Sequence, residues 1–168
     1  MFSPSLIAAA EALIVSAKSK GLLIATAESC TGGLVSGLLT EIAGSSAVFE
    51  RGYVTYSNRA KAEALGVPVD TLRTHGAVSE AVARAMAEGA LARAGVDAAV
   101  ALTGIAGPGG GSPERPVGLV HIASARRGGE TVHKELRLGD RGRTAVRLAS
   151  VAEALALLHA QIEAPRLA

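Results

Sequence analysis

The alternation of helical periodicity with short apolar segments constrains the fold of this chain more than any other feature. Residues 4–19 place apolar side chains three and four positions apart, which predicts an amphipathic helix, and residues 22–27 follow as a short apolar strand. Further helices are expected at 34–42, 57–66, 79–94 and 141–163, and further strands at 47–56 and 96–103. Helices that alternate with strands predict a layered α/β/α fold with a mainly parallel sheet.

A β-hairpin is expected in the last third of the chain. Residues 117–125 and 131–138 have strand character and are joined by a glycine-containing turn. Their antiparallel pairing makes the expected sheet mixed, while segment 96–103 is apolar on both faces and is expected to be central. The 168 residues contain no linker and no internal repeat, so we expect a single domain over 1–168.

The composition is typical of a globular protein, with 49% hydrophobic and 19% charged residues. No apolar run reaches the roughly 18 residues that span a bilayer, and no signal peptide is recognisable. The single cysteine, Cys30, suits a reducing compartment, so we expect a cytoplasmic protein that binds no membrane. Its 17 basic and 15 acidic residues are scattered, and two tyrosines and two phenylalanines provide no stacking platform, so no nucleic-acid partner is expected.

The first candidate for chemistry is segment 28–33, Glu-Ser-Cys-Thr-Gly-Gly, which lies between an expected strand and an expected helix. A serine at a strand end is held rigidly, and the N–H groups of a helix start are free to stabilise an oxyanion or bind phosphate. The layout resembles a nucleophile elbow but lacks the G-x-S-x-G sequence. Two alternatives stay open: Ser29 and Thr31 cap the helix while the glycines allow close packing, or Cys30 is the nucleophile.

Lys61 is the second candidate. Lysine is rare in this chain, and Lys61 lies one turn into the helix that Ser57 is expected to cap. The positive end of that helix favours a neutral amine, burial acts in the same direction, and a neutral lysine is a suitable base for a serine. A solvated surface lysine is the alternative.

The third candidate is the glycine-rich segment 103–112, which follows the expected central strand. Five glycines within residues 104–111 let the backbone approach a ligand closely, as in a phosphate cradle. The segment lacks the Gly-Lys-Ser/Thr ending of a P-loop and does not match G-x-G-x-x-G, which favours a mononucleotide over ATP or NAD bound in the standard way. A flexible surface loop is the alternative.

The fourth candidate is segment 139–143, at the start of the last expected helix. Asp140 is placed to cap that helix, and Arg141 and Arg143 are suited to a phosphate or an acidic intermediate. The histidines show no metal-ligand spacing, and we assign no role to His75, His121, His133 or His159. We expect neither a metal nor a cofactor.

Taken together, these segments resemble the C-terminal domain of the competence/damage-inducible (CinA) family. The resemblance lies in 26–33 (TAESCTGG), 52–58 (GYVTYSN) with Lys61, 75–79 (HGAVS), 103–108 (TGIAGP), 116–118 (PVG) and 139–141 (GDR). It covers nearly the whole chain in order, and its four long motifs make it specific. Larger members carry a further N-terminal domain, and we expect this chain to be the stand-alone form.

The resemblance implies a metal-free serine–lysine amidase that converts nicotinamide mononucleotide, a small-molecule substrate, to nicotinate mononucleotide and ammonia. In that picture Ser29 is the nucleophile, Lys61 is its base, and Tyr56 is hydrogen-bonded between or beside them. The residues expected to contact the substrate are Glu28, Cys30, Thr31, Gly32, Thr103, Gly104, Gly107, Arg141 and Arg143.

Two other roles stay open. One is a nucleotide-binding regulatory module without turnover, linked to competence or DNA damage, although an intact Ser29, Tyr56 and Lys61 count against it. The other is oligomerisation, which would add to catalysis. The family resemblance implies oligomers, and the alanine-rich segment 79–94, with Met86 and Leu91, is suited to packing between subunits, so we expect a homo-oligomer.

Overall fold

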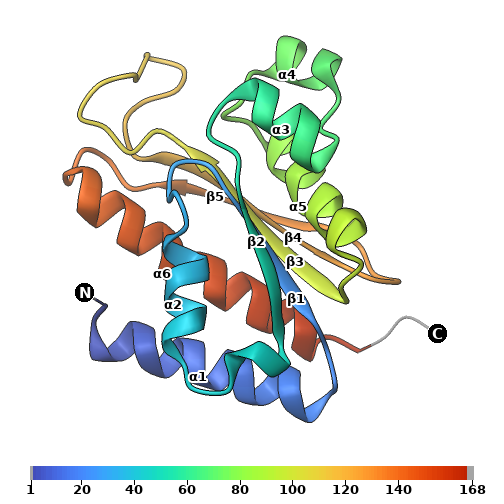
Figure 1. Ribbon diagram of the computed structural model, residues 1–168. Helices are drawn as coiled ribbons and strands as arrows, with labels where there is room; N and C mark the ends of the chain where they lie inside the picture. Colours follow the sequence, from blue (N-terminus) through green and yellow to red (C-terminus); the bar gives the residue numbers. More distant parts are fainter. Residues whose placement is uncertain (1, 166–168) are drawn as a thin grey trace.

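The computed structural model describes residues 2–165, which form one five-stranded sheet flanked by helices (Figure 1). The strands are β1 (Ile24–Glu28), β2 (Phe49–Val54), β3 (Ala98–Gly104), β4 (Leu119–Arg126) and β5 (Val132–Arg137), in the order β2-β1-β3-β4-β5. β1 pairs in parallel with β2 and β3, whereas β4 pairs antiparallel with β3 and β5. Four strands therefore point one way and β4 the other, and the expected mixed sheet with β3 at its centre is confirmed.

Helices lie on both sides of this sheet (Figure 1). On one side are α1 (Pro4–Ser19), α2 (Leu34–Glu41) and α6 (Arg143–Glu163), and on the other α3 (Asn58–Leu65), α4 (Val69–His75) and α5 (Glu80–Ala94). A 3₁₀ turn, η1 (Ser45–Ala47), precedes β2. The serine caps are as expected, because Ser57 accepts a hydrogen bond from Ala60 N–H and Ser79 accepts one from Val82 N–H.

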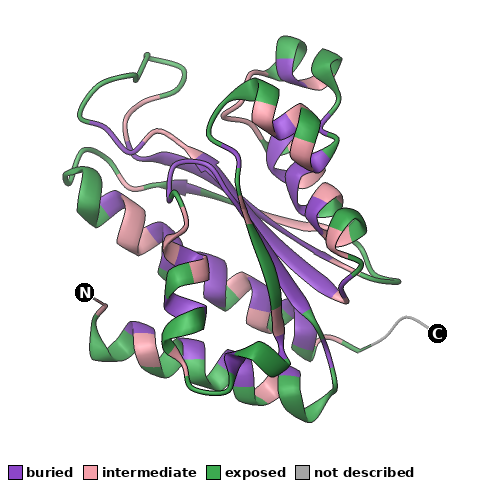
Figure 2. Cartoon of the chain, viewed as in Figure 1, coloured by how far each residue is buried: buried purple, intermediate pink, exposed green. Residues whose placement is uncertain are grey.

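Buried residues lie on both faces of the sheet (Figure 2), and the two core layers differ in the size of their side chains. Small side chains line the α5 side, where buried alanines of β1, β3 and β4 meet the alanines and the one methionine of α5 (Ala25, Ala27, Ala99, Ala101, Ala123, Ala125, Ala83, Met86, Ala87, Ala90). Larger aliphatic side chains fill the α6 side. Met86, which was expected to be available for a subunit contact, is fully buried inside its own chain. The homo-oligomer stays a prediction.

Two helices differ from expectation. α4 was not among the expected helices, because it has seven residues and buries only Leu72, too little to give a periodic pattern. α6 begins at Arg143 rather than at 141, and Asp140 is not its N-cap. Gly142 holds that position with φ 88°, a left-handed value suited to glycine, while Asp140 accepts a hydrogen bond from Gly142 N–H.

α6 is the one helix within residues 2–165 whose length and mean hydropathy match a membrane span. In this fold one side of it is part of the core: eight of its residues are buried, and it packs on β3, β4 and α1. Gln161 on the same helix donates its amide to the carbonyls of Ser124 and Glu130, which ties α6 to the β4–β5 hairpin.

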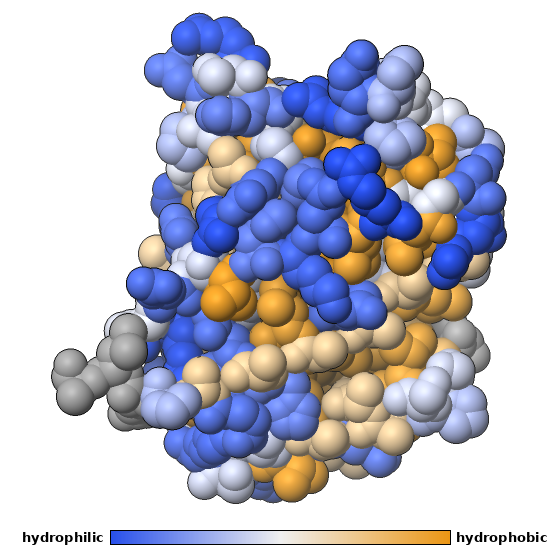
Figure 3. Space-filling view, turned by 180° about the vertical axis from the view of Figure 1, so that it is seen from behind, coloured by the Kyte–Doolittle hydropathy of each residue, from blue (hydrophilic) through white to orange (hydrophobic). Residues whose placement is uncertain are grey.

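The outer edge strand β5 is polar. Lys134, Glu135 and Arg137 are exposed on it, and charged side chains on an edge strand disfavour pairing with another sheet. β5 lies at the back of the sheet in Figure 1, and the view from behind shows hydrophilic residues across the centre of that side (Figure 3).

Glu28, the last residue of β1, caps α2 with its side chain. It is fully buried, and its carboxylate accepts hydrogen bonds from the N–H groups of Gly33 (3.1 Å), Val35 (3.1 Å) and Ser36 (2.9 Å) and from the Ser36 hydroxyl (3.0 Å). These N–H groups belong to the first helical turn, which lacks acceptors within the helix, and a negative charge there is favourable. The cap therefore comes from Glu28, and no side chain of the intervening turn supplies it.

Two helix glycines are expected to respond in opposite directions to alanine. A Cβ on Gly89 of α5 would lie 2.0 Å from the Leu65 carbonyl oxygen, so Gly89→Ala must push α3 away, at a cost of about 1–3 kcal/mol. A Cβ on Gly37 of α2 meets nothing nearer than 4.0 Å, so Gly37→Ala is expected to stabilise by roughly 0.5–1 kcal/mol through helix propensity. Urea unfolding of both variants checks this. Equal shifts of the same sign would contradict the packing of α5 against α3.

Replacing Glu28 is expected to be costly although the substitution is small. Glu28→Gln keeps the shape but replaces one acceptor oxygen by an NH₂ group that faces N–H donors. At least one buried donor is left unpaired, at about 1–3 kcal/mol. The free energy of unfolding measures the effect, with Glu41→Gln at the exposed end of α2 as the matched control. A Glu28→Gln variant that is as stable as the control would show that the Glu28 carboxylate does not stabilise the start of α2.

Candidate active site

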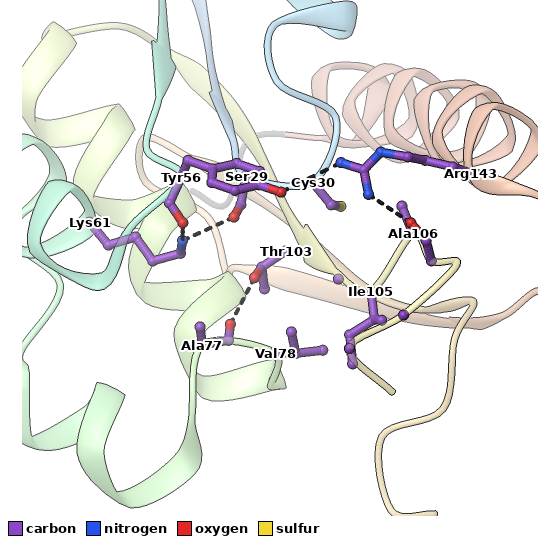
Figure 4. Close-up of a pocket in the computed structure, with 14 residues that line it drawn as sticks. Ser29, Cys30, Tyr56, Lys61, Ala77, Val78, Thr103, Ile105, Ala106 and Arg143 are labelled. Atoms are coloured by element: carbon purple, nitrogen blue, oxygen red, sulfur yellow. Dashed lines mark hydrogen bonds between the residues drawn. The ribbon is translucent and has the colours of Figure 1, made fainter. Parts of the chain in front are cut away.

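A pocket of about 250 Å³ opens where the carboxyl ends of β1 and β3 meet (Figure 4). The chain leaves β1 toward β2 on one side and enters the sheet again at β3 on the other. Such a reversal of strand order leaves a crevice, and α/β proteins bind ligands there. The pocket is lined by Ser29, Cys30, Tyr56, Lys61, Ala77, Val78, Thr103, Gly104, Ile105, Ala106, Gly107, Gly109, Gly110 and Arg143.

Lys61 and Ser29 are in direct contact, although α3 and the turn after β1 supply them separately. Lys61 Nζ lies 3.0 Å from Ser29 Oγ, 2.8 Å from the Thr55 carbonyl oxygen and 3.3 Å from that of Tyr56. The lysine side chain is 1% exposed. A neutral amine has two N–H groups and one lone pair. The two carbonyls accept the two N–H groups, so the lone pair is left for the Ser29 hydroxyl.

The surroundings of Lys61 favour its neutral form. Burial lowers the pKa of the amine below the ordinary lysine value, because the charged form loses its hydration. The groups that Nζ contacts are a hydroxyl and two carbonyls, and none of them is a carboxylate that would hold a proton on it. The alternative of a solvated surface lysine is therefore wrong. This amine is poised to take a proton from Ser29.

Cys30 is a weaker nucleophile in this setting. Burial raises the pKa of its thiol to about 11, so the thiolate is scarce at neutral pH. Lys61 Nζ contacts Ser29 Oγ, whereas no other described residue makes a hydrogen bond to the Cys30 sulfur. The geometry therefore favours Ser29 between the two candidates in this turn.

Tyr56 contributes to the site in a different way from the one expected. Its backbone carbonyl contacts Lys61, while its phenol is 65% exposed and its hydroxyl accepts a long hydrogen bond, 3.5 Å, from Arg143 Nη2. Arg143 Nη1 donates to the Gly107 carbonyl at 2.8 Å. Arg143 therefore bridges the phenol to the glycine-rich loop across the pocket, and the phenol is not between Ser29 and Lys61 (Figure 4).

Thr103 and the neighbouring glycines shape the opposite wall. The Thr103 hydroxyl donates to the Ala77 carbonyl at 2.8 Å, which fixes the loop before α5 over the pocket (Figure 4). A Cβ on Gly104 would lie 2.7 Å from Val120 Cγ2, and one on Gly107, with φ 80°, would lie 2.7 Å from Val117 Cγ1. Only glycine fits at these two positions. The absence of a side chain lets this wall of the pocket pack closely against Val117 and Val120.

Not every residue expected at the site lines the pocket. Glu28 is buried below it in the cap of α2, Thr31 is buried in the turn, and Gly32 and Arg141 are exposed outside the lining. Six lining residues were not among those expected to contact the substrate: Ala77, Val78, Ile105, Ala106, Gly109 and Gly110. They are small or apolar and carry no chemical signature. The only available signal was their position beside motif residues, in 75–79 and in the glycine-rich segment 103–112.

The fold also brings together two histidines that are distant in sequence. His121 Nδ1 and His133 Nε2 lie 2.9 Å apart on β4 and β5, and Glu80 Oε2 is 3.5 Å from His133 Nδ1. Burial lowers the pKa of both imidazoles. Neither lines the pocket, and residues 2–165 contain no group of three or more side chains arranged to hold a metal ion.

Comparisons with known proteins agree with this architecture. The model of the CinA C-terminal domain matches residues 7–162. The chain is 54% identical to the nicotinamide-nucleotide amidohydrolase PncC of Escherichia coli (strain K12), covering 86% of this chain and 87% of that protein. It is 53% identical to a CinA-like protein of Akkermansia muciniphila, covering 92% of this chain but only 37% of that longer relative.

A solved structure shows the same fold over nearly the full length. The competence/damage inducible protein CihA from Agrobacterium tumefaciens superposes with a TM-score of 0.95 at 54% sequence identity, and the match covers 98% of this chain and 99% of that one. Family model, sequence identity and fold therefore agree. This chain belongs to the CinA C-terminal domain family.

Proposed function

We propose that this chain hydrolyses the carboxamide of nicotinamide mononucleotide to nicotinate mononucleotide and ammonia. The observation that carries the proposal is the 3.0 Å contact between buried Lys61 Nζ and Ser29 Oγ at the floor of the pocket. A base beside a serine hydroxyl is the arrangement that covalent acyl transfer requires. The substrate class follows from the Escherichia coli relative, whose name is nicotinamide-nucleotide amidohydrolase.

The proposed reaction proceeds through an acyl-enzyme. Lys61 takes the proton of Ser29, and Ser29 Oγ bonds to the carboxamide carbon, which gives a tetrahedral oxyanion. When the intermediate collapses, the C–N bond breaks and Lys61 returns the proton to the departing ammonia. Water then attacks the ester carbon, Lys61 takes a water proton, and the Ser29–carbon bond breaks as Ser29 regains its proton.

The oxyanion needs donors close to Ser29. Within the described residues, the backbone N–H groups of Cys30 and Thr31 donate to no other group, whereas Gly32 N–H donates to the Ser29 carbonyl. Cys30 lines the pocket, whereas Thr31 is fully buried outside its lining, so we assign the Cys30 N–H to the oxyanion. Losing such a donor typically costs about 3 kcal/mol of barrier. Opposite, we assign the substrate phosphate to Arg143 and the backbone at Gly104 and Gly107, because a guanidinium beside open backbone suits a phosphate.

Ser29→Ala and Lys61→Met are each expected to lower kcat for nicotinamide mononucleotide by far more than tenfold while the protein stays folded. The first removes the nucleophile and the second the proton acceptor, and a tenfold loss already corresponds to about 1.4 kcal/mol of barrier. Ammonia release in the presence of a chelator is the measurement. Lys134→Met, which removes an exposed lysine on β5, is the control.

A Ser29→Ala or Lys61→Met variant that keeps more than a tenth of the wild-type rate would contradict the catalytic role proposed for that residue. A wild-type protein that binds the mononucleotide without releasing ammonia would favour the regulatory module over the amidase.

The pH dependence of kcat/KM tests the role of Lys61 independently. The base must be neutral, so the rate is expected to rise with pH as Lys61 loses its proton and then to level off. Because burial lowers the Lys61 pKa, this rise should lie below the usual lysine value of about 10.4. Rates measured between about pH 6 and 10 give the profile. A rate that falls as the pH rises through this range would contradict a neutral Lys61.

A further inference from the structure

Arg147 contacts the turn that carries Ser29 from outside the pocket. It is half-buried on α6, one helical turn after Arg143, and does not line the pocket. Its guanidinium donates to two consecutive backbone carbonyls, from Nε to Cys30 O at 3.1 Å and from Nη2 to Thr31 O at 2.9 Å. A rigid planar fork suits two adjacent acceptors, and an ammonium does not reproduce it.

The hydrogen bond from Arg147 to the Cys30 carbonyl fixes the peptide plane that follows Cys30. In a trans peptide the C=O and the following N–H point in opposite directions. By holding the Cys30 carbonyl toward α6, Arg147 turns the Thr31 N–H away from α6. The neighbouring peptide is fixed differently, because the Ser29 carbonyl accepts from Gly32 N–H and thereby orients the Cys30 N–H.

The consequence is that Cys30 lies between two peptide planes that are both held through their carbonyls. Cys30 lines the pocket and its N–H donates to no other residue among residues 2–165, whereas Thr31 is fully buried and lies outside the lining.

We propose that Arg147 is a positioning residue whose fork on the Cys30 and Thr31 carbonyls holds the turn in the conformation that places Ser29 Oγ for attack and the Cys30 N–H for the oxyanion. The proposal rests on the proposed amidase function. Arg147 lies outside the pocket lining and donates to Cys30 and Thr31 rather than to Ser29, so it acts through the turn. Because an oxyanion exists only after attack, Arg147 affects the transition state and leaves the binding of the carboxamide ground state nearly unchanged.

The first test separates kcat from KM in Arg147→Met and Arg147→Lys. We expect Arg147→Met to lower kcat for nicotinamide mononucleotide by about 10- to 100-fold, which is less than the loss of a whole donor, with KM changed by less than about twofold. Arg147→Lys keeps the charge but not the fork, and should fall between Arg147→Met and wild type. Thermal melting sets an assay temperature at which every variant is folded.

Arg127→Met is the matched control. Arg127 Nη2 also donates to two consecutive carbonyls, those of Gly95 and Val96, but at the opposite end of the sheet from the pocket. Removing it deletes two guanidinium hydrogen bonds to consecutive carbonyls without touching the turn. If Arg147→Met lowers kcat no more than Arg127→Met does, or raises KM with kcat unchanged, the positioning role is overturned.

A second test keeps this proposal distinguishable from the amidase proposal. A fluorophosphonate reacts with an activated serine: the Ser29 Oγ–phosphorus bond forms, the P–F bond breaks, fluoride leaves and Lys61 takes the proton. The attacked phosphoryl group also develops negative charge on oxygen. Mass spectrometry of the Ser29 peptide gives the labelling rate, with Ser29→Ala as the blank.

The outcomes separate cleanly. Wild type that is labelled at Ser29 but does not deamidate the mononucleotide, with labelling at least fivefold slower in Arg147→Met, would keep the role of Arg147 while the substrate proposal fails. Equal labelling rates in wild type and Arg147→Met would overturn the role of Arg147 even if deamidation is observed. Wild type that is neither labelled nor active would overturn both proposals.

Discussion

The carboxylate of Glu28 is the contact on which the geometry of the site depends. It ends β1 and caps α2 at the same time, through three backbone N–H groups and the Ser36 hydroxyl. The five residues between strand and helix, 29–33, are thereby closed into a tight turn, with Ser29 directly beside the last strand residue. A surface serine cap would hold the helix start alone. A buried glutamate on the strand joins the helix start to the sheet.

The remaining parts of the site reach the turn from separate parts of the chain. α3 brings Lys61 because it follows β2, which pairs beside β1, and Thr103 comes from the end of β3 on the other side. α6 crosses the opposite layer and supplies Arg143 to the pocket and Arg147 to the turn. Parallel pairing around β1 is therefore what gathers serine, lysine and threonine at one edge of the sheet.

The fold was largely predictable, because strands and helices of this length leave clear apolar patterns and capping serines. α4 could not be found this way, since a seven-residue helix with one buried side chain has no readable period. At the site, the motifs pointed to Ser29, Lys61 and Thr103, which line one pocket. They did not show that Glu28 is a cap, that the Tyr56 phenol faces Arg143, or that Arg147 holds the turn. Those facts are contacts between distant segments, and no local pattern encodes them.

The two carbonyls that contact Lys61 allow its amine to gain and lose a proton without moving. In the neutral state, Thr55 O and Tyr56 O accept the two N–H groups of the amine, and Ser29 Oγ lies next to the remaining position. After proton transfer the ammonium has three N–H groups, and the same three oxygens are already in place to accept them. Both charge states therefore fit one side-chain conformation. A base that need not move or recruit water during each proton transfer keeps the reorganisation energy of the step low.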